Sequence, residues 1–376
     1  MAENEIVKCT AKIAQFNKPI IGVTGSCGKT TTCKMIQDLL ANNYKINKTH
    51  ENSNNFEGIP WSVNKFFTLN ADIWVLELGI DRINQMAKLA AMVKPTVRII
   101  TNIHSVHLNN FNSLKEYQNE KLKLFDSCQP NNVVIVNNDI PVLANYIKTH
   151  VFPPSVKIIY CGSKDSDDVQ FINYKLNPDN ISSTISIRLN KMQSVLLTFN
   201  LDGINKHNAF NCCLAVACAL HFNIPVTTIR NVLNNFKLYK NRGLITTMPK
   251  YILYDYTYNS TMHAIMKNLE NFKNVMSQHK LIILGTNTNN TTKSINDGVI
   301  PIINYAVGIT NKVLVYTEQP YIVNKYKFKN VVFVHSLNII PKIRVILASS
   351  PGKIHIFIQG PTELKLFDIV DKLLKH

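Results

Sequence analysis

Short apolar runs alternate with longer segments of helical periodicity over the first part of the chain. The apolar runs predict strands at residues 19–24, 73–78, 96–102 and 132–137. Between them, residues 30–42 and 114–128 have helical spacing. Near-continuous apolar strands separated by helices are typical of a mostly parallel sheet that helices cover on both faces. The pattern therefore predicts an α/β fold.

The first domain continues to about residue 240, and a second α/β pattern follows it. Residues 156–201 alternate polar and apolar positions, which predicts strands, and residues 207–222 predict a helix. A basic, polar segment at residues 236–243 then interrupts the pattern, as a link between domains does. Beyond it, strands are expected at 251–254, 280–284, 312–316 and 355–359, with helices at 261–272 and at the end of the chain. We expect an extension over residues 1–19, a larger domain over 20–240 and a smaller α/β domain over 244–376.

Composition narrows the class of protein. With 376 residues, 45% of them hydrophobic, the chain can bury a large core in more than one domain. Its eight cysteines show no C-x-x-C pair and no zinc-finger spacing, so reduced thiols are expected. The start of the chain lacks an apolar signal segment, and the longest uncharged apolar stretch, residues 212–220, is about half of what a membrane span needs. We therefore expect a cytoplasmic protein without a membrane span.

The formal net charge of +17 raises the question of a nucleic-acid partner. The lysines are scattered, however, and form neither a run of five or six like charges nor a basic stripe interleaved with aromatic residues. A diffuse positive surface suits small anionic substrates. No nucleic-acid partner is expected.

A glycine-rich loop joins the first expected strand to the helix that follows. Backbone N–H groups of such a loop, together with the helix N-terminus, cradle phosphates, while the lysine reaches the β- and γ-phosphates and the following hydroxyl binds Mg²⁺. Gly22 stands one place too early for the strict phosphate-loop spacing, so the loop is a variant. Kinases, hydrolases and ligases all use such loops, so it indicates a nucleotide without specifying the reaction. The loop residues are Gly25, Ser26, Cys27, Gly28, Lys29, Thr30 and Thr31.

Two further strands deliver polar residues to the same expected edge of the sheet. Glu77 directly follows four apolar residues, where a carboxylate either holds Mg²⁺ or simply faces water. The next strand leads to His104 and His107. Lone histidines are more often structural than functional, so the pattern alone leaves the role of these two open.

Taken in order, these motifs resemble the Mur ligase family, most closely the members that add D-alanyl-D-alanine to a muramoyl tripeptide. The family's G-T-x-G-K-T-T loop looks like the GSCGKTT sequence here. Its N-N-x-x-G-x-P, E-L-G and T-N-x-x-x-x-H-L-x-x-F-x-S-L segments are similar to residues 54–60, 77–79 and 101–114. The same register places the family's modified lysine on Lys121. Later matches fall on residues 205–211, on Arg242 and on residues 255–259.

The resemblance implies an ATP-dependent ligase that joins a carboxylate to an amine through an acyl phosphate, with Mg²⁺ at two sites. Lys29 and Mg²⁺ would neutralise the charge on the transferred phosphoryl group. Magnesium would be held by Thr30, Glu77, His107 and a carbamylated Lys121. Without the resemblance, Lys121 would be read as an ordinary surface lysine. The fold implied is a phosphate-loop domain followed by a smaller, Rossmann-like α/β domain.

The resemblance also implies roles in nucleotide and substrate binding. Asn208 and Asn211 would contact the nucleotide base, although capping of a helix is an alternative for both. Arg242 and Asp255 would close on the nucleotide from the second domain. Substrate contacts would come from Asn54, Asn55, Tyr258 and Asn259.

The chain departs from the family pattern at both ends. It reaches its first strand within 20 residues, which leaves no room for the domain that grips a UDP sugar in muramoyl-peptide ligases, so a partner chain could supply that recognition. The segments at 285–290 and 359–361 match the family weakly. The carboxylate and amine substrates are therefore not indicated. A nucleotide-binding pseudo-ligase and a small-molecule phosphotransferase remain alternatives to a ligase.

Overall fold

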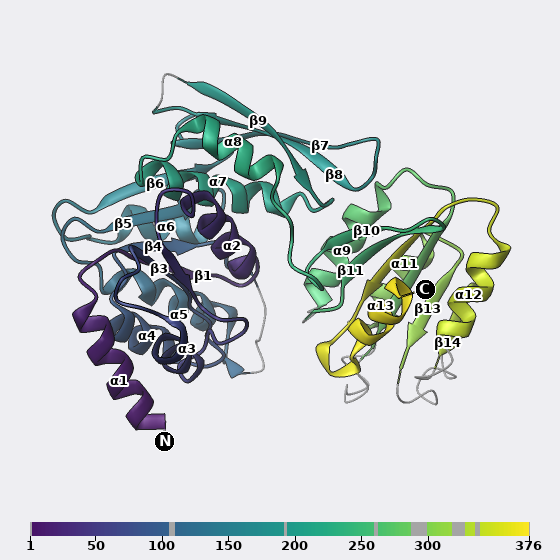
Figure 1. Ribbon diagram of the computed structural model, residues 1–376, viewed down its shortest axis with the longest axis horizontal. Helices are drawn as coiled ribbons and strands as arrows, with labels where there is room; N and C mark the ends of the chain where they lie inside the picture. The colour runs from purple at the N-terminus through teal and green to yellow at the C-terminus, as the bar shows by residue number, and fades with distance from the viewer. Residues whose placement is uncertain are drawn as a thin grey trace. The chain divides into compact units, whose positions relative to one another are not determined.

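A computed structural model describes residues 2–104, 110–191, 194–258, 262–286, 299–317, 328–334 and 339–375 (Figure 1). The chain divides into two compact units. The larger unit comprises Met1–Tyr174, Thr184–Leu201 and Lys206–Phe236. The smaller unit comprises Lys175–Ser183, Asp202–Asn205 and Lys237–His376. The two short excursions into the smaller unit were not indicated by the sequence pattern.

The larger unit contains a sheet in the order β2-β3-β1-β4-β5-β6-β7-β8-β9 among the described residues. Every pairing from β2 to β7 is parallel. β1, β3, β4 and β5 are buried along their whole length, which explains their near-continuous apolar sequences. The strands are β1 (Ile20–Thr24), β2 (Ile46–Lys48), β3 (Ile73–Glu77), β4 (Val97–Ile100), β5 (Val133–Asn137), β6 (Lys157–Gly162), β7 (Val169–Leu176), β8 (Ser182–Leu189) and β9 (Val195–Asp202).

Helices cover both faces of this sheet (Figure 1). Five of them contribute to one hydrophobic core cluster: α1 (Ala2–Gln15), α3 (Gly58–Phe66), α4 (Gln85–Val93), α5 (Leu114–Asp126) and α6 (Pro141–Thr149). Another three contact one another: α2 (Lys29–Leu40), α7 (His207–His221) and α8 (Val226–Asn234). The predicted α/β class with a mostly parallel sheet is confirmed.

The first residues of the chain form a helix that packs on the core. Apolar residues of α1 recur at helical spacing, and Ile13 is buried. The Phe16 ring just after the helix stacks on Trp74 of β3, with ring centroids 3.8 Å apart and an interplanar angle of 9°. The Lys12 ammonium donates to the Val63 carbonyl at the end of α3 (3.0 Å). The segment 1–19, which the sequence pattern marked only as an extension, is thus built into the larger unit.

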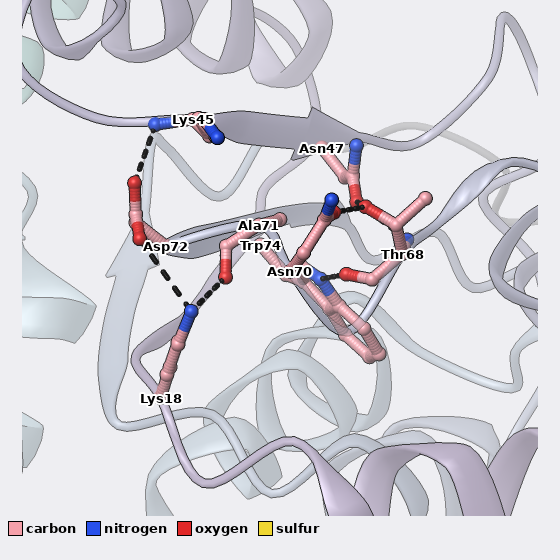
Figure 2. A network of polar contacts seen from close by, with 8 residues as sticks. All are labelled: Lys18, Lys45, Asn47, Thr68, Asn70, Ala71, Asp72 and Trp74. Carbon is pink, nitrogen blue, oxygen red and sulfur yellow. Dashed lines mark hydrogen bonds and ion pairs between the residues drawn. The ribbon is translucent and has the colours of Figure 1, made fainter.

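A polar network fastens the edge strand β2 to the start of β3 (Figure 2). The Asp72 carboxylate accepts the Lys45 backbone N–H (2.9 Å) and pairs with the Lys18 ammonium (3.5 Å). Lys18 also donates to the Ala71 carbonyl (2.7 Å). The backbone N–H of Lys45 and the ammonium of Lys18 hold the pKa of Asp72 below its usual value. β2 was not predicted because it is only three residues long.

The smaller unit has a second sheet, in the order β10-β11-β15-β12-β13-β14, with all pairs parallel except β10 with β11. Two core clusters pack on it. Its strands are β10 (Leu244–Thr247), β11 (Tyr251–Tyr256), β12 (Lys280–Gly285), β13 (Val313–Tyr316), β14 (Val331–Val334) and β15 (Ile354–Gln359). Its helices are α9 (Met262–Lys273), α11 (Ile300–Val307), α12 (Ile339–Ser349), η5 (Thr362–Leu364) and α13 (Leu366–Leu374).

In the described part of the chain, no helix has both the length and the apolar character that crossing a membrane requires.

Replacing Phe16 with alanine should lower the free energy of unfolding of the larger unit by about 3 kcal/mol, because it removes a buried aromatic ring and leaves a cavity against Trp74. Urea unfolding followed by tryptophan fluorescence measures this change, since both tryptophans lie in the larger unit. Val7→Ala on the exposed side of α1 is the matched control and should change the value by less than about 0.5 kcal/mol. Equal effects of the two substitutions would mean that Phe16, just after α1, is not packed on β3.

Candidate active site

The phosphate loop runs from the end of β1 to the start of α2. Gly25 has φ 148° and Gly28 has φ 79°, conformations that residues with a side chain rarely adopt. A Cβ atom on Gly28 would also come within 2.6 Å of the Asn211 carboxamide oxygen. The backbone of the loop therefore requires glycine at these two positions.

Two residues after β4 hold the phosphate loop in place. The Cys27 carbonyl accepts hydrogen bonds from the Thr101 hydroxyl (2.6 Å) and the Asn102 amide (3.0 Å). In return, the Cys27 backbone N–H donates to Asn102 Oδ1 (2.9 Å). Because β4 is the immediate neighbour of β1, these residues meet the loop at the carboxyl edge of the sheet. The Thr-Asn pair at a strand end was visible in the sequence, but this positioning role was not.

Lys29 and Ser26 are tied to groups around the loop. The Lys29 ammonium donates to the Gly25 carbonyl of its own loop (3.0 Å). The Ser26 hydroxyl lies 2.9 Å from the phenol oxygen of Tyr117 on α5 and accepts the His104 backbone N–H (2.9 Å). These contacts bring α5 and the segment after β4 onto the loop.

Glu77 joins the loop at the end of β3. Its carboxylate, on a side chain only 4% exposed, accepts the Thr30 hydroxyl on one oxygen and the Asn54 amide on the other, each at 2.8 Å. The Thr49 hydroxyl fixes the backbone by accepting the Glu77 N–H (2.9 Å). A hydroxyl and a carboxylate are the oxygen donors that Mg²⁺ prefers, so the pair fits that ion. No group of three His, Cys, Asp or Glu side chains that could hold a metal occurs among the described residues.

The two asparagines predicted to contact substrate have different surroundings. Asn54 orients the Glu77 carboxylate, as its 2.8 Å contact shows. The Asn55 carboxamide oxygen accepts the backbone N–H of Gly58 (2.7 Å), the first residue of α3. The Asn55 side chain therefore stabilises the start of α3.

Lys121 lies on α5 with only 2% of its surface exposed. Its ammonium is 4.9 Å from the centre of the Tyr117 ring, and it makes no hydrogen bond or ion pair with the residues that the structure describes. Burial and the positive charge of Lys29 hold the pKa of Lys121 well below its usual range. Burial likewise raises the pKa of the Cys27 thiol, against the opposing charges of Lys29 and Lys121. Lys29 of the loop and Lys121 of α5 are thus close enough to influence each other, and the charged form of Lys121 is disfavoured.

Both ends of α5 are held, which fixes Lys121. The Ser113 hydroxyl caps the helix N-terminus by accepting the Glu116 N–H (3.1 Å). At the other end, the buried guanidinium of Arg98 on β4 donates to the Leu124 carbonyl (3.0 Å) and the Ser127 carbonyl (2.8 Å). A cation at the C-terminal carbonyls of a helix is favourable. Arg98 was not singled out from the sequence, because its two backbone partners lie 26 and 29 residues further along, at the C-terminal end of α5.

Asn208 and Asn211 lie in the first turns of α7, and both are buried. The Asn211 amide donates to the Asn208 carboxamide oxygen (3.3 Å). Asn211 also borders Gly28, so α7 brings this pair against the phosphate loop. The predicted placement beside a nucleotide is compatible with this geometry.

Arg242, Asp255 and Tyr258 belong to the smaller unit. The Arg242 guanidinium stacks on the Tyr258 ring at 3.8 Å. The Asp255 carboxylate accepts hydrogen bonds from the Thr257 hydroxyl (2.7 Å) and the Asn241 backbone N–H (3.0 Å), while burial raises its pKa. Two other predicted site residues, His107 and Asn259, lie outside the described residues.

Comparisons with known proteins agree with this geometry. The Mur ligase middle domain family matches residues 23–219, just over half of the chain. The chain therefore belongs to the Mur ligase family. UDP-N-acetylmuramoyl-tripeptide–D-alanyl-D-alanine ligase of Borreliella burgdorferi is 29% identical over 272 residues, which cover 71% of this chain and 55% of that protein. The chain thus spans just over half the length of that curated relative.

Solved structures share the fold of the whole chain. MurF from Acinetobacter baumannii has a TM-score of 0.84 at 19% identity, covering 100% of this chain and 80% of that chain. MurF from Thermotoga maritima in complex with ADP has a TM-score of 0.81 at 21% identity, covering 98% and 82%. At these identities the likeness shows the fold alone.

Lys121→Met should raise the free energy of unfolding at about pH 7, because it removes the cost of burying an amine whose charged form is disfavoured. The native pKa lies below the ordinary 10.5, so the cost is present at low pH and fades as the pH approaches that value. A tenfold change in proton affinity corresponds to about 1.4 kcal/mol. Urea unfolding at about pH 7 and about pH 10, without bicarbonate or metal, measures the difference.

Lys115→Met on the same helix is the control, because Lys115 is exposed. This substitution should leave the unfolding free energy within about 0.5 kcal/mol at both pH values. A Lys121→Met variant that is destabilised at neutral pH would contradict the assignment of Lys121 as a disfavoured cation.

Proposed function

We propose that the chain is an ATP-dependent, ADP-forming ligase that joins a carboxylate to an amine. The observation that carries this proposal is the buried Lys121 with a depressed pKa, beside the Lys29 of a phosphate loop whose Thr30 is bonded to Glu77. A phosphate loop alone would suit many reactions. A buried lysine whose charged form is disfavoured, in a domain that also holds a hydroxyl–carboxylate pair suited to Mg²⁺, is what distinguishes the ligase proposal.

The phosphates of ATP would bind to the backbone N–H groups of the loop Gly25, Ser26, Cys27, Gly28, Lys29, Thr30 and Thr31. Lys29 would donate to the β- and γ-phosphate oxygens after leaving the Gly25 carbonyl. The ADP bound in the Thermotoga maritima neighbour supports a nucleotide at this fold position. Asn208 and Asn211 are proposed to contact the base, with Arg242 and Asp255 contributing from the smaller unit.

Magnesium is proposed to bind at Thr30 and Glu77, whose oxygens face each other at 2.8 Å. The ion supplies positive charge that neutralises the transferred phosphoryl group. Asn54 would keep the Glu77 carboxylate oriented while its other oxygen meets the ion. A second ion is proposed to use His107 together with Lys121.

We propose that Lys121 reacts with carbon dioxide to form a carbamate. Only the uncharged amine is nucleophilic, and the depressed pKa of Lys121 favours that form. The amine nitrogen would form a bond to the carbon of carbon dioxide and release one proton to water, which leaves an anionic carbamate. The positive charge of Lys29 disfavours the ammonium form of Lys121 but attracts this anion. Its oxygens are also ligands of the kind that Mg²⁺ prefers, whereas an ammonium would repel the ion.

The proposed reaction has two steps. A carboxylate oxygen of the first substrate attacks the γ-phosphorus of ATP, which gives an acyl phosphate and ADP. The amine of the second substrate then attacks the acyl carbon, loses a proton and expels phosphate, which leaves an amide. The chain has to position the reactants and stabilise charge, and no protein nucleophile is required.

The substrates are proposed as a small anionic carboxylate and an amine, consistent with the net charge of +17. The Borreliella relative is named for a UDP-N-acetylmuramoyl tripeptide and D-alanyl-D-alanine, which makes both compounds the first candidates to test. Tyr258 and Asn259 are proposed substrate contacts in the smaller unit. Recognition of the substrate by a partner chain remains a prediction, as does a cytoplasmic location.

The full chain should release ADP and phosphate and form an amide in equal amounts when it is given magnesium-ATP, bicarbonate and a cognate carboxylate–amine pair. Mass spectrometry of the amide, combined with phosphate release, screens a panel of amino acids, dipeptides and muramoyl peptides. Lys29→Ala, Glu77→Ala and Lys121→Ala should each slow amide formation by about 100-fold or more, because each removes charge stabilisation from the transition state.

Lys115→Ala serves as the control and should keep the full rate. Transfer of phosphate to a hydroxyl substrate without an amide would identify a phosphotransferase instead. Binding of ATP without turnover by any pair would indicate a pseudo-ligase. Amide formation that survives all three substitutions would contradict the proposed site.

A further inference from the structure

Three aromatic side chains cluster near the end of β2, and two of them are exposed. The His50 ring stacks on Phe66, with centroids 4.3 Å apart and an interplanar angle of 12°. Trp61 meets both rings edge-on, at 5.8 Å from His50 and 5.2 Å from Phe66. Trp61 is 40% exposed and Phe66 is 37% exposed. We call His50, Trp61 and Phe66 the aromatic platform.

The platform carries a positive charge. The Lys65 ammonium lies 5.1 Å from the Trp61 ring centre and 5.3 Å from the Phe66 ring centre. In the part of the chain that the structure describes, no carboxylate forms an ion pair with Lys65. Exposed ring surface next to such a cation attracts a flat, electron-rich group that also carries negative charge.

The platform is connected to the candidate active site through one short turn. His50 is held by its backbone N–H, which donates to the Ser62 hydroxyl (2.9 Å), and its carbonyl accepts the Ser53 N–H (3.1 Å). The next residue, Asn54, donates to the Glu77 carboxylate. Four residues span at most about 14 Å of chain, so His50 of the platform lies within about that distance of Asn54, which holds the carboxylate.

β2 is parallel to β3, so His50 follows the carboxyl end of its strand, on the same sheet edge as Glu77. Ligands of open α/β sheets bind outside this edge. Single exposed apolar side chains scattered over a surface are ordinary. A cluster of exposed rings at this edge of the sheet instead indicates a ligand-binding surface.

We propose that the aromatic platform binds a planar ring that carries negative charge and belongs to the carboxylate substrate. The ring would stack on Trp61 or Phe66, and Lys65 would meet its charge. That the ligand is a substrate rests on the proposed ligase function. The same chemistry is offered by a nucleoside phosphate and by an aromatic carboxylate.

Fluorescence titration of the full chain tests the platform without ATP or turnover. The chain has two tryptophans, and Trp74 is fully buried, so quenching by a stacked ring reports on Trp61. The probes are uridine 5′-monophosphate, benzoate, uridine and ribose 5-phosphate. A Lys29→Ala background removes competition from the phosphate loop. At least one of the two ring-bearing anions should quench saturably, whereas ribose 5-phosphate should not; the tighter of the two identifies the source of the ring.

Matched variants sharpen the test, with equilibrium dialysis measuring affinity where the fluorophore is lost. Trp61→Ala should weaken binding of the ring-bearing anion by about tenfold or more, and Trp61→Phe by less than about threefold, because stacking needs only a ring. Lys65→Ala should weaken binding of the ring-bearing anion but leave binding of uridine unchanged. Leu69→Ala, at an exposed apolar position outside the platform, should have no effect.

The proposal is overturned if neither ring-bearing anion binds at millimolar concentration, if ribose 5-phosphate binds as tightly, or if Trp61→Ala binds as the parent does. Should Trp61→Ala fold poorly, the exposed Lys65→Ala variant keeps the test decisive, because unchanged binding of the ring-bearing anion in that variant would also overturn the proposal. A failure of the ligase function would appear separately, as absent ATP turnover in a protein whose platform still binds the ring.

Discussion

A buried lysine beside a second lysine is the constraint around which the larger unit is organised. Transferring an ammonium from water into the protein is costly, and a like charge nearby adds to the cost. Lys121 has both disadvantages, since it is 2% exposed and the charge of Lys29 acts on it. Helix α5 nevertheless holds Lys121 in place, because Ser113 caps one end and Arg98 binds the carbonyls at the other. Loss of the proton would relieve this unfavourable arrangement, and the proposed carbamylation would place an anion there instead.

The sheet order explains how the other groups reach the same place. β3 and β4 flank β1 on either side, so the residues that follow these three strands meet at one edge. The phosphate loop follows β1, and Glu77 ends β3. The two residues that hydrogen-bond to Cys27 follow β4. The edge strand β2 adds the turn that carries His50 and Asn54, and α3 after it carries the other two rings of the aromatic platform. The site is therefore a consequence of parallel topology as much as of any single motif.

Much of this could be predicted from the sequence because apolar runs and glycine positions are local signals. The strands β1, β3, β4 and β5 and the phosphate loop were visible in this way, and the fold class followed. Helix α1 was missed even though its apolar residues have helical spacing, and β2 was too short to detect. The excursions of the chain at Lys175–Ser183 and Asp202–Asn205 depend on tertiary contacts that no local pattern records.

The candidate site was less accessible to sequence reasoning. Lys121 stands in a charged segment that reads as a solvated helix face, and only resemblance to a family singled it out. Its burial depends on the packing of α5 against the loop through Tyr117 and Ser26. The partners of Asn54, Thr101 and Arg98 are likewise set by which strands are neighbours. His107 and Asn259 remain predictions from the resemblance.

The central proposal is that Lys121, whose charged form is disfavoured, takes up carbon dioxide beside the phosphate loop. Carbon-13 NMR of the full chain in ¹³C-labelled bicarbonate measures this directly. Carbamylation of Lys121 should give one protein-bound carbamate resonance, strengthened by Mg²⁺, which disappears in Lys121→Met and persists in Lys115→Met. A spectrum without such a resonance, or one unchanged in Lys121→Met, would contradict the account.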